Sequence, residues 1–149
     1  MRAVIQRVLK ASVDINDEIV ADIESGILSL VGFRHDDDYD EMDYVINKIL
    51  GLRIFDDEKG VMNLSVVDVE NHVLLVPQFT LYGDVRKGKR PSYSSAMSPN
   101  KADAFFMEFI KRSKLKYNKI KSGIFGANMK VSLVNTGPVT ILIDSDKKF

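Results

Sequence analysis

Residues 26–51 read GILSLVGFRHDDDYDEMDYVINKILG, and the hydrophobic period changes within this stretch. From Ile27 to Phe33 nearly every residue is apolar, which is typical of a strand buried on both faces. From Met42 to Leu50 the apolar residues recur at i, i+3, i+4, i+7 and i+8, which marks one face of a helix. A buried strand followed by an amphipathic helix indicates a mixed α/β domain.

Strand patterns extend from this stretch in both directions. Toward the N-terminus we expect strands over residues 3–8, 12–15 and 19–23. Toward the C-terminus we expect strands over 52–55 and 72–82, and a hairpin of 129–134 and 139–143 joined by a turn at 135–138.

A second helix is predicted after a loop over residues 83–97. Ser98 is its expected N-cap and Pro99 its first residue. Five apolar residues share its inner face at helical spacing, and we assign them to the core: Ala102, Phe105, Phe106, Phe109 and Ile110. The sequence therefore predicts one β-rich α/β domain over residues 1–149, with two main helices packed on a sheet face.

The chain has 149 residues, of which 45% are hydrophobic and 28% charged, and it contains no cysteine. This length fits one domain with its own core. No apolar run reaches the roughly 20 residues that a membrane helix needs, and the first residues do not resemble a secretion signal. We therefore expect a cytoplasmic protein with no membrane segment and no disulfides.

The charge is zero overall but divided between the two halves of the chain. Residues 1–75 hold 7 basic and 16 acidic side chains, a net charge of −9, and residues 76–149 hold 14 basic and 5 acidic, a net charge of +9. This asymmetry hints at a polyanionic partner for the second half. The alternative is that the two halves interleave in the fold and their charges pair.

Basic residues form two groups in the second half. The loop group is Arg86, Lys87, Lys89 and Arg90, and the helix-end group is Lys111, Arg112, Lys114, Lys116, Lys119 and Lys121. Ten cations within 36 positions are typical of a track that binds phosphates. The alternative for the helix-end group is that it complements the negative end of the helix dipole, which leaves the loop group unexplained.

Few residues suggest common side-chain catalysis. His35 and the aspartates at 36–38 could gather a divalent cation, but these aspartates precede the helix that carries Met42, where negative charge is favoured for structural reasons. We give neither His35 nor His72 a metal or triad role. The chain also lacks the Gly-x-Ser-x-Gly elbow, the Walker motif and the dinucleotide glycine pattern. We therefore predict no metal site and no cofactor.

The stretch VPQFTLY, residues 76–82, carries polar side chains within an apolar run. If the strand continues, its alternation places Gln78, Thr80 and Tyr82 on one face. Gln78 and Thr80 would then offer an amide and a hydroxyl side by side, able to orient a carbonyl or a hydroxyl. The alternative is a solvated strand face. Pro77 suggests that the strand lies at an edge or contains a bulge.

These residues belong to a set of motifs through which the whole chain resembles the D-aminoacyl-tRNA deacylases, also called D-tyrosyl-tRNA(Tyr) deacylases. The motifs are IQRV at 5–8, ASV at 11–13, LRIF at 52–55, MNL at 62–64, QFTL at 78–81, RPS at 90–92, GxFxA at 123–127 and NxGPVT at 135–140.

The resemblance implies a layered β/β/α domain that works as a homodimer with two pockets at the subunit interface. Its substrate would be D-aminoacyl-tRNA, whose ester it hydrolyses, and it would also remove glycine mischarged on tRNA(Ala), as a proofreading step in translation. The implied site residues are Gln78, Phe79 and Thr80 on the catalytic floor, and Gly137, Pro138, Arg7 and Met129 in substrate binding. With tRNA as the substrate, we expect tRNA binding by clustered cations: Arg86, Lys87, Lys89, Arg90, Lys111, Arg112 and Lys114.

The same resemblance implies that Gly137-Pro138 enters the pocket from the other subunit through a cis peptide and is held there by Arg7. Two backbone carbonyls of this motif would bind the α-ammonium group and exclude an L side chain, while glycine would pass. Pro77 stands where the family usually has serine. This departure leaves a relaxed chirality for small L residues as an alternative, beside a tRNA-binding protein without catalysis.

Two mechanisms are compatible with the motif. Thr80 could be a nucleophile, although no base lies near it in sequence. We favour attack by water assisted by the ribose 2′-hydroxyl of the tRNA, with the amides of Phe79 and Thr80 stabilising the oxyanion.

Overall fold

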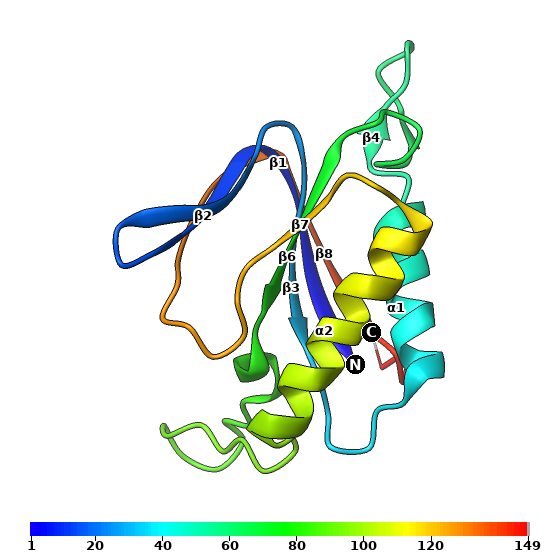
Figure 1. Ribbon diagram of the computed structural model, residues 1–149. Helices are drawn as coiled ribbons and strands as arrows, with labels where there is room; N and C mark the ends of the chain where they lie inside the picture. Colours follow the sequence, from blue (N-terminus) through cyan, green and yellow to red (C-terminus); the bar gives the residue numbers. More distant parts are fainter. Residues whose placement is uncertain (149) are drawn as a thin grey trace.

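Strand β1 (Arg2–Ile15) connects the parts of the sheet in the computed structural model, which describes residues 1–148 (Figure 1). Its first half pairs antiparallel with β3 (Gly26–Gly32) and its second half with β2 (Glu18–Ile23). Along its other edge it pairs antiparallel with β8 (Lys130–Asp144). One uninterrupted strand therefore replaces the two that the sequence predicted over residues 3–8 and 12–15.

The sheet continues beyond β3 with two parallel strands. They are β6 (His72–Pro77) and β7 (Ile120–Ser122), which complete the order β2-β1-β3-β6-β7. A separate pair, β4 (Phe55–Asp56) and β5 (Met62–Leu64), forms a small hairpin that projects from the body (Figure 1). The strand predicted over 52–55 is therefore wrong in its bounds, and the short strands β5 and β7 were missed.

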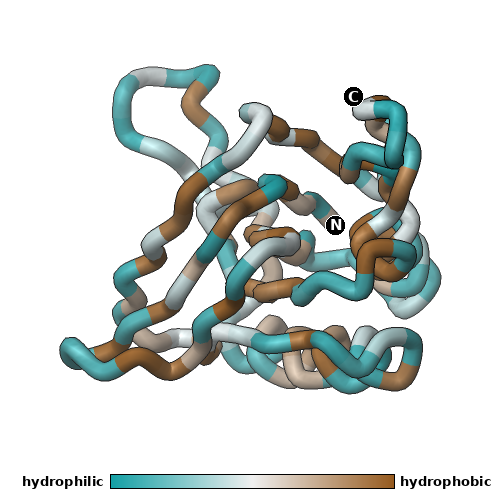
Figure 2. The backbone as a smooth tube through the Cα atoms, turned by 90° about the horizontal axis from the view of Figure 1, so that it is seen from above, coloured by the Kyte–Doolittle hydropathy of each residue, from teal (hydrophilic) through white to brown (hydrophobic). Residues whose placement is uncertain are grey.

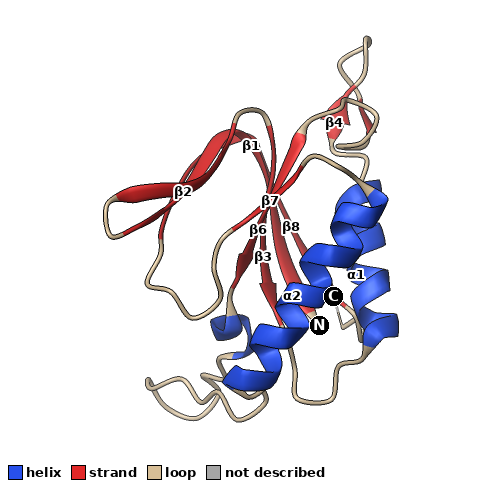
Figure 3. Cartoon of the chain, in the orientation of Figure 1, coloured by secondary structure: helices blue, strands red, loops and turns tan. Residues whose placement is uncertain are grey.

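Both α-helices lie on the same side of the sheet (Figure 3). Helix α1 (Tyr39–Gly51) begins at Asp38, whose side chain caps two backbone amides while Glu41 caps the amide of Asp38 in return. This capping box confirms a role at the helix start for Asp38, whereas Asp36 pairs with Arg34 and the buried Asp37 accepts from the ammonium group of Met1. Helix α2 (Pro99–Lys116) begins with Ser98 at the N-cap and Pro99 at the first position, as predicted.

The main core lies between the helices and the sheet. The rings of Phe105, Phe106 and Phe109 all pack around Phe33, with centroids 5.2 to 6.4 Å apart. These contacts confirm that the aromatic stripe of α2 belongs to the core.

A second core covers the opposite face of the sheet. It forms where the outer parts of β1, β2 and β8 curl over β3 and β6, and it buries Val13, Ile23, Leu28 and Leu74. The domain thus has three layers, two of strand and one of helix, as expected for a β/β/α fold. Turns such as the tip between β1 and β2 are hydrophilic where they project into solvent (Figure 2).

Strand β8 differs most from the sequence-based prediction. Residues 130–144 form one strand along β1, and the predicted hairpin with a turn at 135–138 is wrong. Val8 pairs with Asn135 and Gln6 with Thr140, so four residues of β8 lie opposite Arg7 alone. The turn residues therefore form a wide bulge, because β1 offers a continuous partner on both sides of them.

Pro77 ends β6, and β6 is not an edge strand. The amide of Gln78 donates to Val31 O of β3, so the ring nitrogen of Pro77 faces the side of β7, where the ladder has already ended at Ser122. The missing N–H therefore costs no ladder hydrogen bond. Within residues 1–148, none of the helices combines the length and apolarity needed to cross a membrane.

Candidate functional site

The QFTL motif forms a 3₁₀ helix, η1 (Phe79–Tyr82), at the end of β6. The prediction that a strand continues to residue 82 is therefore wrong, because both neighbouring strands have ended and extended backbone has no partner here. Gly32 makes the turn possible, since a Cβ at that position would lie 2.8 Å from the carbonyl oxygen of Gln78. Gly83 closes the turn with its amide bonded to Thr80 O at 2.9 Å.

Helix η1 presents polar groups to solvent. The side-chain amide of Gln78 donates to the hydroxyl of Thr80. Within residues 1–148, no protein acceptor receives a hydrogen bond from the backbone amide of Phe79 or from that of Thr80. An amide cannot take a proton from Thr80, so the structure offers this hydroxyl no base. Two free amides beside an exposed aromatic ring can instead stabilise developing negative charge.

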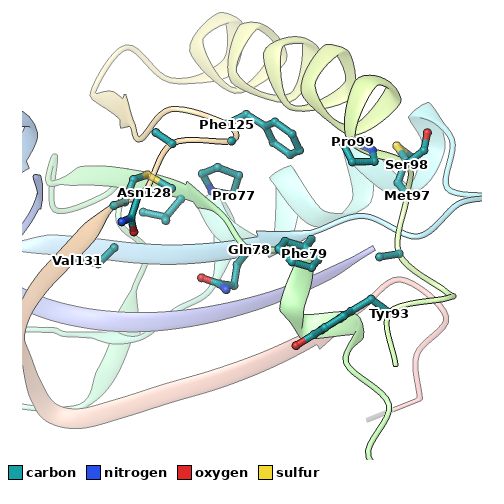
Figure 4. A pocket seen from close by; sticks show the side chains of 15 residues that line it. Pro77, Gln78, Phe79, Tyr93, Met97, Ser98, Pro99, Phe125, Asn128 and Val131 are labelled. Carbon is teal, nitrogen blue, oxygen red and sulfur yellow. The ribbon is translucent and has the colours of Figure 1, made fainter. Parts of the chain in front are cut away.

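A cavity of about 690 Å³ lies beside η1, under the first turn of α2 (Figure 4). Its walls are mainly apolar and aromatic, and Phe79 meets Tyr93 edge to face with ring centroids 5.1 Å apart. The lining residues come from the end of β6 and η1 (Val76, Pro77, Gln78, Phe79), the loop before α2 (Tyr93, Ala96, Met97, Ser98, Pro99) and the segment after β7 (Phe125, Gly126, Ala127, Asn128, Met129, Val131).

Three of the predicted site residues line this cavity: Gln78, Phe79 and Met129. Thr80 lies next to it and is exposed. Two further lining residues, Tyr93 and Phe125, were not predicted as site residues. The loop that carries Tyr93 has no hydrophobic period to interpret, and Phe125 stands in the GxFxA motif without a signal of its own.

The Gly137-Pro138 motif lies elsewhere on the same chain. Its peptide bond is cis, and both residues are exposed in the bulge of β8. Arg7 lies opposite this bulge and pairs with Ile27 of β3. Pro77, the residue before Gln78, pairs with Val31 of the same strand. Four residues of β3 separate the two places, about 13 Å of strand. One chain therefore does not bring its Gly137-Pro138 motif into its own cavity.

Arg7 holds the bulge against the β4–β5 hairpin. Its Nη1 donates to Ile54 O at 2.7 Å and its Nε to Thr136 O at 3.3 Å. The same Nη1 lies 3.5 Å from Asp56 Oδ1. On the other side, the amide of Asn135 donates to the carbonyls of Arg7 and Val139, at 3.0 and 2.9 Å. The shape of the bulge is therefore fixed by side-chain hydrogen bonds to backbone.

The loop group precedes α2, whereas the helix-end group occupies the C-terminal part of α2 and the residues after it; the 18 residues of the helix span about 27 Å. The loop group lies in the segment between η1 and α2, both of which contribute to the cavity, and its Arg86 lines a separate hollow with Arg2 and Arg34. In this group Arg86 pairs with Asp84 at 2.6 Å, and its guanidinium lowers the pKa of that carboxyl to about 2. Lys87, Lys89 and Arg90 are exposed.

Most of the helix-end group forms ion pairs with acids from the first half of the chain. Its cross-half pairs are Arg112 and Lys116 with Asp43, Lys119 with Glu70 and Lys121 with Asp22, while Lys111 pairs with Glu108 on its own helix. Lys114 is exposed. The alternative in which the charges of the two halves pair with each other therefore holds for the helix-end group. The loop group is the better candidate for binding a polyanion.

Residues 1–148 contain no group of three or more His, Cys, Asp or Glu side chains arranged to hold a metal ion. His35 contacts Asp36 at 3.5 Å on the surface, away from the cavity lining.

Comparison with known proteins assigns the chain to a family. The family model described as D-Tyr-tRNA(Tyr) deacylase matches residues 4–144. The chain is 52% identical to the D-aminoacyl-tRNA deacylase of Thermosipho melanesiensis and 49% identical to that of Clostridioides difficile, over the full length of both chains in each case.

Two solved structures share the fold. A structure named c-Myc DNA Unwinding Element Binding Protein superimposes with a TM-score of 0.93 at 40% identity, covering 97% of this chain and 98% of the other. A structure named as a probable eukaryotic D-amino acid tRNA deacylase superimposes with a TM-score of 0.82 at 17% identity, covering 95% of this chain and 97% of the other. At this identity the likeness shows the fold alone. Because the family model and the full-length relatives agree with the motifs around the cavity, the chain belongs to the D-Tyr-tRNA(Tyr) deacylase family.

Proposed function

We propose that this chain, an ester hydrolase of the D-aminoacyl-tRNA deacylase type, removes D-amino acids and mischarged glycine from tRNA in the cytoplasm. The observation that carries the proposal is the cavity beside η1, which combines aromatic walls with two free backbone amides. Aromatic walls suit the flat face of the terminal adenine base, and the amides suit the ester carbonyl that turns into an oxyanion.

We propose further that the complete pocket needs a second copy of the chain. The exposed Gly137-Pro138 bulge is held rigidly by Arg7 and Asn135 but lies far from the cavity of its own chain. In a homodimer it enters the partner's cavity, where its carbonyl oxygens bind the α-ammonium group of the substrate. An L side chain then meets backbone and is excluded, whereas a D side chain points away.

The hydrolytic step uses water and the tRNA itself. The hydroxyl of Thr80 accepts a hydrogen bond from Gln78, which supports a role in positioning over one as nucleophile. The ribose 2′-hydroxyl next to the ester orients the attacking water, and the amides of Phe79 and Thr80 stabilise the tetrahedral intermediate. Its collapse releases the amino acid and leaves the 3′-hydroxyl on the tRNA.

The acceptor end of the tRNA lies along the loop group, because Lys87, Lys89 and Arg90 are exposed in the loop that joins Phe79 to Tyr93, two residues of the cavity wall. The helix-end cations are engaged by carboxylates, so they compete less well for phosphates. Binding of tRNA is therefore expected to weaken as the salt concentration rises.

Deacylation of matched D-tyrosyl-, L-tyrosyl- and glycyl-tRNA tests this function. The wild-type protein should hydrolyse the D-tyrosyl and glycyl esters and spare the L-tyrosyl ester. Pro138→Ala should lower this discrimination by about tenfold or more, since it removes two ring methylenes and even one methylene in a tight pocket has effects of that order. Val134→Ala, an exposed change on the same strand, is the matched control and should behave as wild type.

Two results would contradict the proposal. No ester loss above the spontaneous rate would indicate a tRNA-binding protein without catalysis. Hydrolysis of small L-aminoacyl esters at the rate of the D esters would indicate relaxed chirality.

A further inference from the structure

Gly123 is a buried glycine whose backbone does not require glycine. Its φ lies outside the positive range that Gly60, Gly88 and Gly126 adopt, and its amide donates to Leu75 O at 2.9 Å in an ordinary extension of β7. Conformation therefore does not explain the absence of a side chain here. The remaining explanation is the close approach of another group.

That group is the side chain of Met129. A Cβ at Gly123 would lie 2.7 Å from Met129 Sδ, and 3.7 Å from both Pro77 Cδ and Val13 Cγ1. Met129 lines the cavity and packs against the second core. Its thioether therefore rests on the bare backbone of Gly123, and this position keeps it at the cavity wall.

A side chain at position 123 would push Met129 in one direction. Pro77 and Val13 already occupy the other sides of the contact, and the second core behind them is packed. The open space next to Met129 is the cavity. Because methionine is flexible, its side chain would swing into that space and narrow it.

The wall formed by Tyr93 is arranged in the same way. Gly83 also has a φ that any residue adopts, −66°, and a Cβ there would lie 3.0 Å from Thr80 O of the preceding turn and 3.1 Å from Tyr93 Cε1. Tyr93 in turn holds Phe79 through the edge-to-face contact. Gly83 thus makes room for both the turn of η1 and the Tyr93 ring, whereas Gly123 makes room for Met129.

We propose that Gly123 is a positioning residue that sets the width of the substrate cavity by seating Met129 against the backbone. This inference rests on the proposed function, because it takes the cavity to be the place where the aminoacyl end of the tRNA binds. Gly123 itself touches no substrate, and it acts through Met129.

Gly123→Ala should raise KM for D-tyrosyl-tRNA by about 10- to 200-fold, the range for one methylene too many in a fitted pocket, with kcat nearly unchanged. The reacting groups belong to η1, which this substitution leaves in place. The double variant Gly123→Ala/Met129→Ala removes the displaced side chain, so its KM should return to that of Met129→Ala alone. Gly51→Ala is the matched control, because no atom lies within 4 Å of a Cβ there.

A measurement without substrate separates this inference from the proposed function. In protein labelled with ¹³C at the methionine methyl groups, the Met129 methyl of Gly123→Ala should show new contacts to the Phe79 and Phe125 rings that wild type lacks. If wild type hydrolyses no D-tyrosyl-tRNA but these contacts form, the proposed function fails and the role of Gly123 stands.

The role of Gly123 is overturned if the Met129 methyl keeps its wild-type contacts in Gly123→Ala. It is also overturned if KM stays within twofold of wild type, or if the double variant shows no rescue. If Gly123→Ala does not fold, the double variant Gly123→Ala/Met129→Ala tests the role of Gly123, because removing the Met129 side chain relieves the overlap at 2.7 Å.

Discussion

Replacing Arg7 with methionine should destabilise the bulge that carries Gly137-Pro138. The substitution keeps the apolar stem and removes the guanidinium, which donates to Ile54 O at 2.7 Å and to Thr136 O at 3.3 Å. A hydrogen bond from a charged donor contributes about 1.5–3 kcal/mol, and the longer bond belongs at the low end of this range. The contact with Asp56, a half-exposed carboxylate, adds about 0–1 kcal/mol. We therefore expect a loss of about 3 kcal/mol in the free energy of unfolding.

Urea denaturation at fixed protein concentration measures this loss as a shift of the unfolding midpoint. Lys10→Met is the matched control, because Lys10 is an exposed cation on the same strand, and its effect should stay within about 0.5 kcal/mol. Arg7→Lys should behave more like Arg7→Met than like wild type, since an ammonium group cannot reach two carbonyls with the geometry of a guanidinium fork.

The activity of the same variants tests the link from bulge to function. Under conditions where Arg7→Met is fully folded, deacylation of D-tyrosyl-tRNA should still fall sharply, because the motif is no longer held in place. A loss of stability below about 1 kcal/mol, or full activity in the folded variant, would refute the reasoning.

Three further predictions concern the site and its surroundings. Thr80→Ala should retain substantial activity, while a tRNA ending in 2′-deoxyadenosine should be poorly hydrolysed; a trapped acyl-enzyme on Thr80 would contradict this. Charge reversal at Lys87, Lys89 and Arg90 should weaken tRNA binding and flatten its salt dependence in filter-binding assays, more than a matched triple reversal at the far end of α2. The carboxyl pKa of Asp84 is lowered to about 2, so its ion pair supports the loop above about pH 4 and is lost as the pH falls through about 2; a carbon NMR titration with a midpoint at the ordinary value would refute the pairing.

Local pattern was enough to predict several elements. The i, i+3, i+4, i+7 spacing of apolar residues around Met42 and Phe106 predicted both helices and their buried faces. Ser98-Pro99 marked the start of α2. These signals are local because a helix closes its hydrogen bonds within its own segment. The apolar run at residues 27–33 likewise predicted β3, since a strand that is covered on both faces has no polar side.

Strand ends were harder to predict because a strand depends on its partners. The alternation in residues 76–82 is that of a strand, yet the chain turns into η1 where the neighbouring strands stop. The sequence at 135–138 has the composition of a turn, yet it becomes a bulge because β1 continues alongside it. In both places the missing information lay in distant segments.

By itself, the sequence determined the fold class, the family and the motifs that meet at the cavity, because each of these depends on short stretches of neighbouring residues. The tertiary structure decided which of these residues share a surface. It placed Met129 and Phe79 in the lining of one cavity, put Gly137-Pro138 about 13 Å of strand away from Gln78, and paired most of the helix-end cations with carboxylates from the other half of the chain. These outcomes depend on contacts between residues far apart in sequence, and only the packed chain specifies such contacts.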